Sequence, residues 1–147
     1  MVIELLIIRY DNYIRDNLWE EKMNILDIGT DIIEVERIKN ALNKRGDFLK
    51  KIFTEREIEM FEGKGNNPQT IAGNFAAKEA ISKSLGLGIR GYNFKDIEIL
   101  RNDLGKPIVK TYNNLEQICI QYSVLEIKVS ISHSENYAVA NAITITT

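Results

Sequence analysis

The sequence has little cysteine, histidine or proline: one, one and two residues respectively among 147. With a single thiol, Cys119, the chain can form neither a disulfide framework nor a cysteine-based metal site. Because Cys119 lies in a mostly apolar helical pattern, we expect it to be a buried small hydrophobe. The lack of a disulfide framework favours a cytoplasmic location.

Strong charge of one sign and long apolar runs are also missing. The formal net charge is -2, so no field of the whole molecule attracts nucleic acid or an anionic membrane. We expect neither of them as a partner. A composition of 44% hydrophobic and 27% charged residues is ordinary for a single globular domain.

The first 22 residues are expected to be an appendage to that domain. Their apolar run, residues 2–8, is too short to span a bilayer, contains Glu4 and precedes no small-residue cleavage site. A convincing first strand begins directly after Met23. We therefore expect a folded domain over residues 23–147 and an N-terminal appendage over residues 1–22, and leave open whether the true start lies at Met23.

One long helix is predicted in the middle of the chain. Asn67 suits its N-cap, Pro68 its first turn and Gly86 its end, so about five turns can run between Asn67 and Gly86. Around it, the patterns predict a helix over 34–44, a capping box over 54–57, strands over 97–100 and 107–111, a helix over 115–120 and a final hairpin of strands over 126–132 and 137–145.

Glu79 and Lys83 lie one turn apart on the central helix, on the same face as Ala72 and Ala76. The small alanines would leave room for a ligand to approach the helix backbone. The simpler explanation is a surface ion pair at i,i+4, worth about 0.2–0.5 kcal/mol. The pair alone therefore does not decide between structure and function.

The predicted first strand, residues 24–33, carries two acids on one face. We expect Asp27 to face solvent. Asp31 differs because Gly29 clears space beside it and because it stands where the strand gives way to a helix, a common place for a functional carboxylate. Together with Glu79, Asp31 makes an all-oxygen ligand set of the kind that Mg²⁺ prefers, and Lys83 adds a positive charge for a phosphate.

Two other features allow two interpretations each. Arg37 belongs to a basic helix face, which is either solvated or a docking surface for an acidic partner. His133, the only histidine, lies in the turn of the last hairpin, where a structural donor is commoner than a catalyst. Serines surround His133, but no nucleophile elbow or ordered third partner supports a serine nucleophile.

Five segments, taken together and in this order, resemble the bacterial holo-acyl carrier protein synthases, which are small phosphopantetheinyl transferases. They are residues 28–38, 53–57, 75–83, 105–107 and 129–134. The resemblance extends from Met23 to about Ile145. It implies an α+β fold, in which a small antiparallel sheet packs with a long central helix and shorter helices, and a cytoplasmic homotrimer with active sites between protomers.

The resemblance also implies roles for five residues. Asp31 and Glu79 match the magnesium ligands, Lys83 the lysine that meets the coenzyme A phosphates, His133 the histidine near the nucleotide end of coenzyme A, and Arg37 a contact to the acyl carrier protein. The implied reaction transfers the 4′-phosphopantetheine arm of coenzyme A to a serine of apo-acyl carrier protein for fatty acid biosynthesis, and releases adenosine 3′,5′-bisphosphate. A metal-bound water or an acidic side chain would each serve as the base.

Two positions depart from the family pattern. Asn74 stands where relatives usually carry arginine, so a phosphate contact is either missing or supplied by Lys78, Arg90 or a neighbouring protomer. Asp27 replaces a small residue and either perturbs the metal site or faces water. The alternatives to the transferase are a related magnesium-dependent nucleotide phosphotransferase or phosphohydrolase, a non-catalytic module that binds carrier protein, and a degenerate trimer with a structural role.

Overall fold

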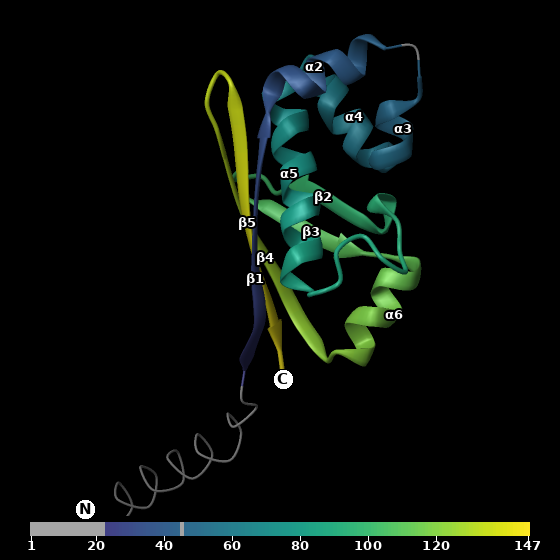
Figure 1. The fold of residues 1–147 in the computed structure, drawn as a ribbon, viewed down its shortest axis with the longest axis vertical. Coiled ribbons are helices and arrows are strands. Elements are labelled where there is room, and N and C mark those ends of the chain that lie inside the picture. The colour runs from purple at the N-terminus through teal and green to yellow at the C-terminus, as the bar shows by residue number, and fades with distance from the viewer. Residues whose placement is uncertain (1–22, 45) are drawn as a thin grey trace, which may run out of the picture.

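The computed structural model describes residues 23–44 and 46–147 and is shown in Figure 1. The predicted appendage over residues 1–22 lies outside the described residues. In chain order the elements are β1 (Asn24–Glu34), α2 (Val35–Asn43), α3 (Phe48–Ile52), α4 (Glu55–Gly63), α5 (Pro68–Ser84), the 3-10 helix η1 (Phe94–Asp96), β2 (Ile97–Arg101), β3 (Pro107–Thr111), α6 (Asn113–Gln121), β4 (Val124–His133) and β5 (Tyr137–Thr146). The predicted α+β class is confirmed.

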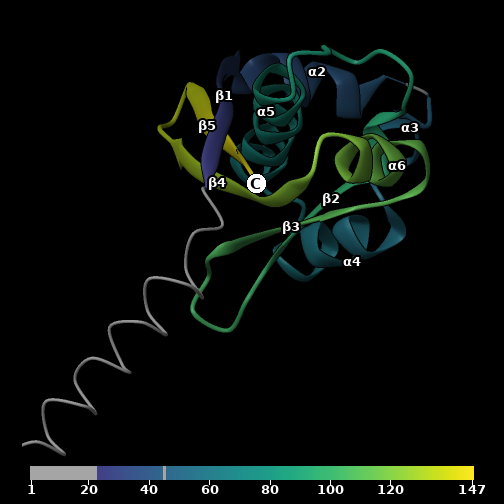
Figure 2. The same cartoon turned by 90° about the horizontal axis from the view of Figure 1, so that it is seen from below.

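The strands form two antiparallel sheets, whereas the family resemblance implied one small sheet. One sheet has three strands in the order β1-β5-β4, and the other pairs β2 with β3. The three-stranded sheet runs along one side of α5, while the two-stranded sheet and the other helices lie on the opposite side (Figures 1 and 2). Alternation along each strand predicted the hairpins correctly. It does not show which strands lie at the edge of a sheet.

Helix α5 is the centre of the fold, and its caps are those that the sequence predicts. The Asn67 side chain accepts hydrogen bonds from the backbone N–H groups of Gln69 and Thr70, and Pro68 occupies the first turn. The helix is buried on nearly every side. Ala72 and Ala76, the two alanines that were expected to leave room for a ligand, are both fully buried in the core.

Glycine allows the three-stranded sheet to lie directly against α5. A Cβ atom at Gly29 of β1 would fall 1.9 Å from the Ala80 carbonyl oxygen, and one at Gly73 of α5 would fall 2.8 Å from the Ile131 side chain of β4. The expectation that Gly29 clears space for a ligand is therefore wrong, because α5 occupies that space. The same contact places β1 against the last turns of α5, where Glu79 and Lys83 lie.

The two faces of β1 have different surroundings. Gly29 and Ile33 are buried under α5, whereas Ile28 and Ile32 on the opposite face are 64% and 63% exposed. Asp27 is exposed, as predicted, and its Oδ1 atom accepts a hydrogen bond from the N–H of Ile28. Asp27 therefore faces water, which is the second of the two alternatives given for that position.

The remaining local predictions are mostly confirmed. Thr54 and Glu57 form the predicted capping box at the start of α4, Gly105 adopts a positive φ of 79° between β2 and β3, and Cys119 is buried in α6. Within the described part of the chain, no helix combines the length and the apolar character that crossing a membrane requires.

Candidate metal and phosphate site

The structure brings Asp31 and Lys83 together from different elements. The Lys83 Nζ atom donates to Asp31 Oδ1 at 2.9 Å and to the Thr30 carbonyl oxygen at 2.7 Å. Lys83 thus pairs with β1 rather than with its helical neighbour Glu79, so the i,i+4 ion pair is not formed among the described residues. The side chains of Lys83 and Asp31 are 49% and 19% exposed, which leaves the pair open to a ligand.

Glu79 completes this cluster from the same face of α5. Partial burial raises the pKa of the Glu79 carboxyl, the nearby Asp31 carboxylate raises it further, and Lys83 lowers it. Two carboxylates therefore share a small region that has a single lysine to balance them. Such an arrangement attracts a second cation, and bound phosphate would in turn use the free donor capacity of the lysine.

This donor set fits magnesium better than zinc. Asp31 and Glu79 supply oxygen ligands only, and no group of three or more histidine, cysteine, aspartate or glutamate side chains that could hold a metal occurs in the described part of the chain. Mg²⁺ is commonly held by one or two carboxylates, with water and substrate phosphates completing its coordination. Asp31 and Glu79 are thus the residues that would hold it, and Lys83 lies beside them.

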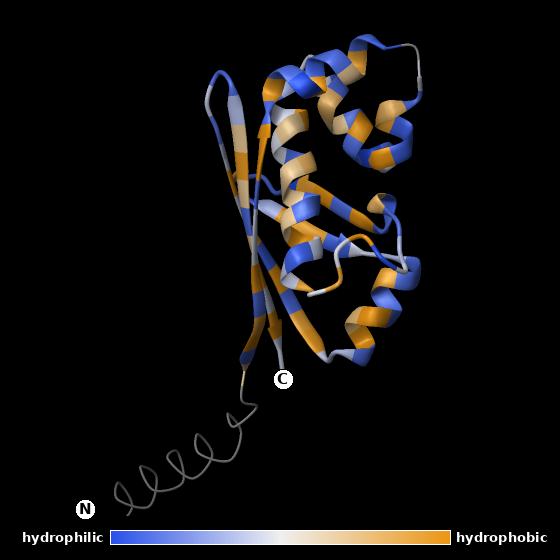
Figure 3. Cartoon of the chain, viewed as in Figure 1, coloured by the Kyte–Doolittle hydropathy of each residue, from blue (hydrophilic) through white to orange (hydrophobic). Residues whose placement is uncertain are grey.

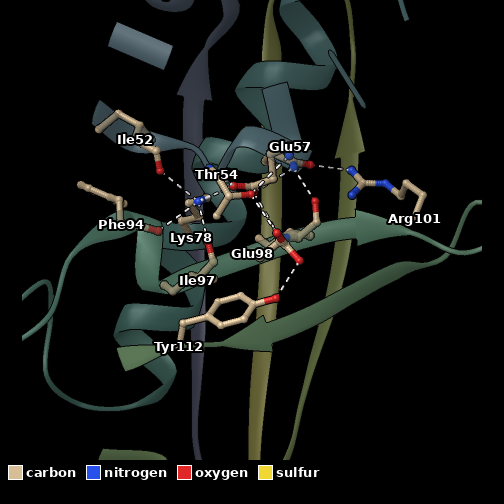
Figure 4. Close-up of polar contacts among 11 residues, drawn as sticks. Ile52, Thr54, Glu57, Lys78, Phe94, Ile97, Glu98, Arg101 and Tyr112 are labelled. Atoms are coloured by element: carbon tan, nitrogen blue, oxygen red, sulfur yellow. Dashed lines mark hydrogen bonds and ion pairs between the residues drawn. The ribbon is translucent and has the colours of Figure 1, made fainter. Parts of the chain in front are cut away.

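A second lysine of α5 has a very different environment. Lys78 is fully buried, and its Nζ atom contacts Glu57 Oε2 at 2.7 Å and the carbonyl oxygens of Ile52, Phe94 and Ile97 at 3.0, 3.0 and 2.6 Å (Figure 4). An ammonium has three hydrogens to donate, and these four oxygen acceptors can engage all of them. The suggestion that Lys78 supplies a phosphate contact is therefore wrong, because every donor is already used inside the protein.

Burial acts on both members of this internal pair. It raises the pKa of the Glu57 carboxyl and lowers the pKa of the Lys78 ammonium, and in each case the partner's opposite charge and hydrogen bond oppose the shift. Glu57 also accepts from the N–H groups of Thr54 and Ile99. The sequence revealed Glu57 only as half of a capping box. Its partner Lys78 was considered only as one possible source of a phosphate contact.

Asn74 belongs to the same buried network. Its Nδ2 atom donates to the Ile99 carbonyl oxygen at 2.8 Å, and its Oδ1 atom accepts from the Arg101 guanidinium at 2.7 Å. Asn74 thus stands where the family resemblance predicts an arginine. The guanidinium of Arg101, from β2, lies beside it. The sequence did not point to Arg101, since nothing in the strand pattern indicates that its side chain reaches α5.

His133 and Arg37 lie apart from the Asp31 cluster. His133 is exposed at the end of β4, the edge strand opposite to β1 in the three-stranded sheet. It lines a cavity together with Arg101 and Lys64. Arg37 is exposed on α2. Within this chain, the structure thus brings together Asp31, Glu79 and Lys83 but leaves His133 at the other edge of the sheet.

Comparison with known proteins identifies the family. Residues 27–142 match the family model described as the 4′-phosphopantetheinyl transferase superfamily. The chain belongs to this superfamily. The match lies within the domain predicted over residues 23–147 and contains every candidate site residue discussed above. The resemblance inferred from five short segments is thereby confirmed at the level of the family.

Named relatives and solved structures of this superfamily agree with each other. The chain is 50% identical over 123 residues to a holo-[acyl-carrier-protein] synthase of Clostridium perfringens, covering 81% of this chain and 92% of that protein. A synthase structure from Neisseria meningitidis gives a TM-score of 0.77 at 33% identity, covering 82% of this chain and 98% of that one. A synthase from Bacillus anthracis, solved in complex with CoA (3′,5′-ADP), gives 0.70 at 38% identity, covering 84% and 98%.

Proposed function

We propose that this protein is a holo-acyl carrier protein synthase, which transfers the 4′-phosphopantetheine arm of coenzyme A to a serine of apo-acyl carrier protein in the cytoplasm. The observation that carries the proposal is the open cluster of Asp31, Glu79 and Lys83, at the positions that the family resemblance assigns to this chemistry. The synthase names of relatives at about half identity support the same activity.

Asp31 and Glu79 would hold Mg²⁺, and Lys83 would bind a phosphate oxygen beside it. When bound, the metal neutralises charge on the transferring and leaving phosphates and orients them. The carrier serine hydroxyl gives its proton to a base, and its oxygen attacks the phosphorus that bears the pantetheine arm. The bond from that phosphorus to the bridging pyrophosphate oxygen breaks, and adenosine 3′,5′-bisphosphate leaves with the electron pair. Positioning and electrostatic stabilisation supply most of the catalysis in such transfers.

We further propose a homotrimer that is formed through the outer face of the three-stranded sheet. Ile28, Ile32 and Ile143 are 64%, 63% and 36% exposed there, and apolar residues recur along β1 and β5 (Figure 3). Exposed apolar surface of this kind marks a protein contact. Assembly would let the Asp31 cluster at the β1 edge of one protomer face the His133 edge of the next, which one protomer cannot achieve alone.

The carrier protein is proposed to dock on α2, where Arg37 is exposed. An acidic carrier would be attracted to this basic residue, and the contact would affect mainly the association rate. This role stands on the exposure of Arg37 and on the family resemblance.

Mass spectrometry of apo-acyl carrier protein tests the proposed activity. The carrier is incubated with this protein, coenzyme A and Mg²⁺, beside a chelator control and a carrier whose acceptor serine is replaced by alanine. We expect the mass of one phosphopantetheine arm to be added in the complete reaction and in neither control. Unmodified carrier together with hydrolysis of coenzyme A or of another nucleotide would overturn the proposal in favour of a phosphohydrolase.

A further inference from the structure

A polar cavity on the β4 side of α5 is lined by basic side chains and by no acidic side chain of the described residues. Its volume is about 190 Å³, and its walls come from the first turns of α5, the β2–β3 hairpin and the end of β4. Lys64, Arg101 and His133 line it together with Thr70 and Gln69, and no aspartate or glutamate does. A concave surface of this composition favours an anion.

Arg101 is the base whose position in this cavity is fixed. Its guanidinium donates through Nη2 to Asn74 Oδ1 at 2.7 Å and through Nη1 to the Leu100 carbonyl oxygen at 3.3 Å. Figure 4 shows Arg101 at one end of the buried polar network, with its guanidinium directed toward that network. The remaining guanidinium hydrogens are available to a ligand, since the group has five N–H donors.

Asn74 can orient the Arg101 guanidinium because the Asn74 amide itself cannot rotate freely. The Asn74 side chain is fully buried, and its Nδ2 atom donates to the Ile99 carbonyl oxygen at 2.8 Å and to Glu57 Oε1 at 3.4 Å. Both of those partners only accept hydrogen bonds, so the amide oxygen must point toward Arg101. A protein-internal network therefore orients a guanidinium at a cavity wall.

Arg101 has no acidic partner at close range. Among the residues that the structure describes, no carboxylate forms an ion pair with Lys64, Arg101 or His133. Partial burial lowers the pKa of Arg101, and the Glu57 carboxylate opposes this shift only in part. An anion in the cavity would supply the missing counter-charge, and planar guanidinium groups bind phosphate oxygens in a bidentate manner.

We propose that Arg101 binds the 3′-phosphate at the nucleotide end of coenzyme A, and that Asn74 is the positioning residue that holds its guanidinium for this contact. The assignment rests on the proposed function, in which the pyrophosphate lies at Asp31, Glu79 and Lys83. Coenzyme A carries one further phosphate, and the basic cavity at the β4 edge is suited to it. Because the Asp31 cluster and His133 lie at opposite edges of the sheet, this cavity belongs to the neighbouring protomer of the proposed homotrimer.

The test compares the binding of adenosine 3′,5′-bisphosphate with that of 5′-AMP, by calorimetry, on the full-length protein. Arg101→Gln should weaken bisphosphate binding on the order of 10- to 100-fold and leave 5′-AMP binding unchanged. Arg101→Lys should fall between, because it keeps the charge but loses the planar fork. Lys110→Gln removes an exposed charge from β3 outside the cavity and should change neither affinity.

Asn74→Ala tests the positioning role in the same assay. It should reduce the preference for the bisphosphate partially, because Arg101 keeps its charge but loses its fixed orientation, and Arg101→Gln in that background should then cost less than in the wild type.

The proposal is overturned if Arg101→Gln weakens both nucleotides equally, if it weakens neither, or if the wild-type protein does not prefer the bisphosphate. The assay needs neither a carrier protein nor transfer. A wild-type protein that prefers the bisphosphate through Arg101 but leaves every carrier unmodified would therefore overturn the proposed function and not this assignment.

Discussion

Two lysines of α5, five residues apart, form ion pairs of opposite character. Lys78 pairs with Glu57, and both side chains are 0% exposed, whereas Lys83 pairs with Asp31 at 49% and 19% exposure. The distances are similar, 2.7 Å and 2.9 Å. Lys78 has all its hydrogens engaged by oxygens of the protein, while Lys83 keeps donor capacity and stands beside a second carboxylate, Glu79.

This difference shows how one helix separates stability from chemistry. The closed pair joins α5 to α4 and to the η1–β2 segment, and it leaves no group unsatisfied. The open pair joins α5 to β1 and leaves excess negative charge at the surface. Damage to the closed pair should therefore appear mainly in folding, and damage to the open pair mainly in activity.

The largest effect is expected for Lys78→Met, which breaks the closed pair. It leaves the Glu57 carboxylate buried without its cation, so the free energy of unfolding should fall by about 3–5 kcal/mol. Chemical denaturation monitored by circular dichroism measures this loss. Lys110→Met, an exposed lysine of β3, is the matched control and should change it by less than about 0.5 kcal/mol. A similar small change for both variants would contradict the structural role of Lys78.

Lys83→Met should show the reverse behaviour. Loss of a positive charge at the proposed phosphate site should lower the rate of transfer to apo-acyl carrier protein by about 10²–10³-fold. The free energy of unfolding should change by at most about 1 kcal/mol, because the pair is partly solvated. Rates and denaturation curves are measured on the same preparation. An unfolded variant, or a stable variant with unchanged rate, would remove the distinction between the two pairs.

Thr54→Ala is expected to have a moderate effect on the closed network alone. The Thr54 hydroxyl caps α4 by accepting from the Glu57 N–H at 3.2 Å, and it donates to Glu98 Oε2 at 2.9 Å. Its loss should lower the free energy of unfolding by about 0.5–2 kcal/mol without changing kcat. Thr54→Ser keeps the hydroxyl and should restore most of the stability. A loss of activity at unchanged stability would argue that this network reaches the active site.

The smallest effect concerns the pH dependence of stability in the absence of metal. Because the pKa of Glu79 is raised in the folded protein, the folded state favours the protonated carboxyl, and the contribution of Glu79 to stability falls as pH rises through the raised pKa. Glu79→Gln should therefore gain stability relative to the wild type between acidic and neutral pH, as measured by urea denaturation with a chelator present. The exposed Glu62→Gln variant should show no such trend.

Local signals in the sequence predicted the secondary structure well for physical reasons. The caps at Thr54 and Asn67 and the alternation of the last hairpin involve residues close in sequence, so the pattern contains the interaction itself. The pairing of β1 with β5 and the close contact of Gly29 with Ala80 join residues far apart. Alternation gave β1 two faces, but it did not indicate that the face with Asp31 is the one under α5.

The candidate site was predictable to the same extent. Asp31 was identified because it lies at the end of a strand, and Glu79 and Lys83 were identified because they share one face of a helix. The partner of Lys83 was not, since the i,i+4 spacing favoured Glu79 over Asp31. Lys78 and Arg101 were misread or missed because only tertiary packing buries the first and brings the second to Asn74.

The most direct test of the central claim is the rate of transfer to apo-acyl carrier protein across a series of Mg²⁺ concentrations, for the wild type and for Glu79→Gln. Glutamine keeps the shape of the side chain but removes the charge that would hold the metal. We predict that the wild-type rate rises with Mg²⁺ to a plateau, while the folded variant stays about 10²-fold or more below it throughout. A folded Glu79→Gln protein with the wild-type rate and the same magnesium dependence would contradict the assignment of Asp31 and Glu79 as the catalytic metal site.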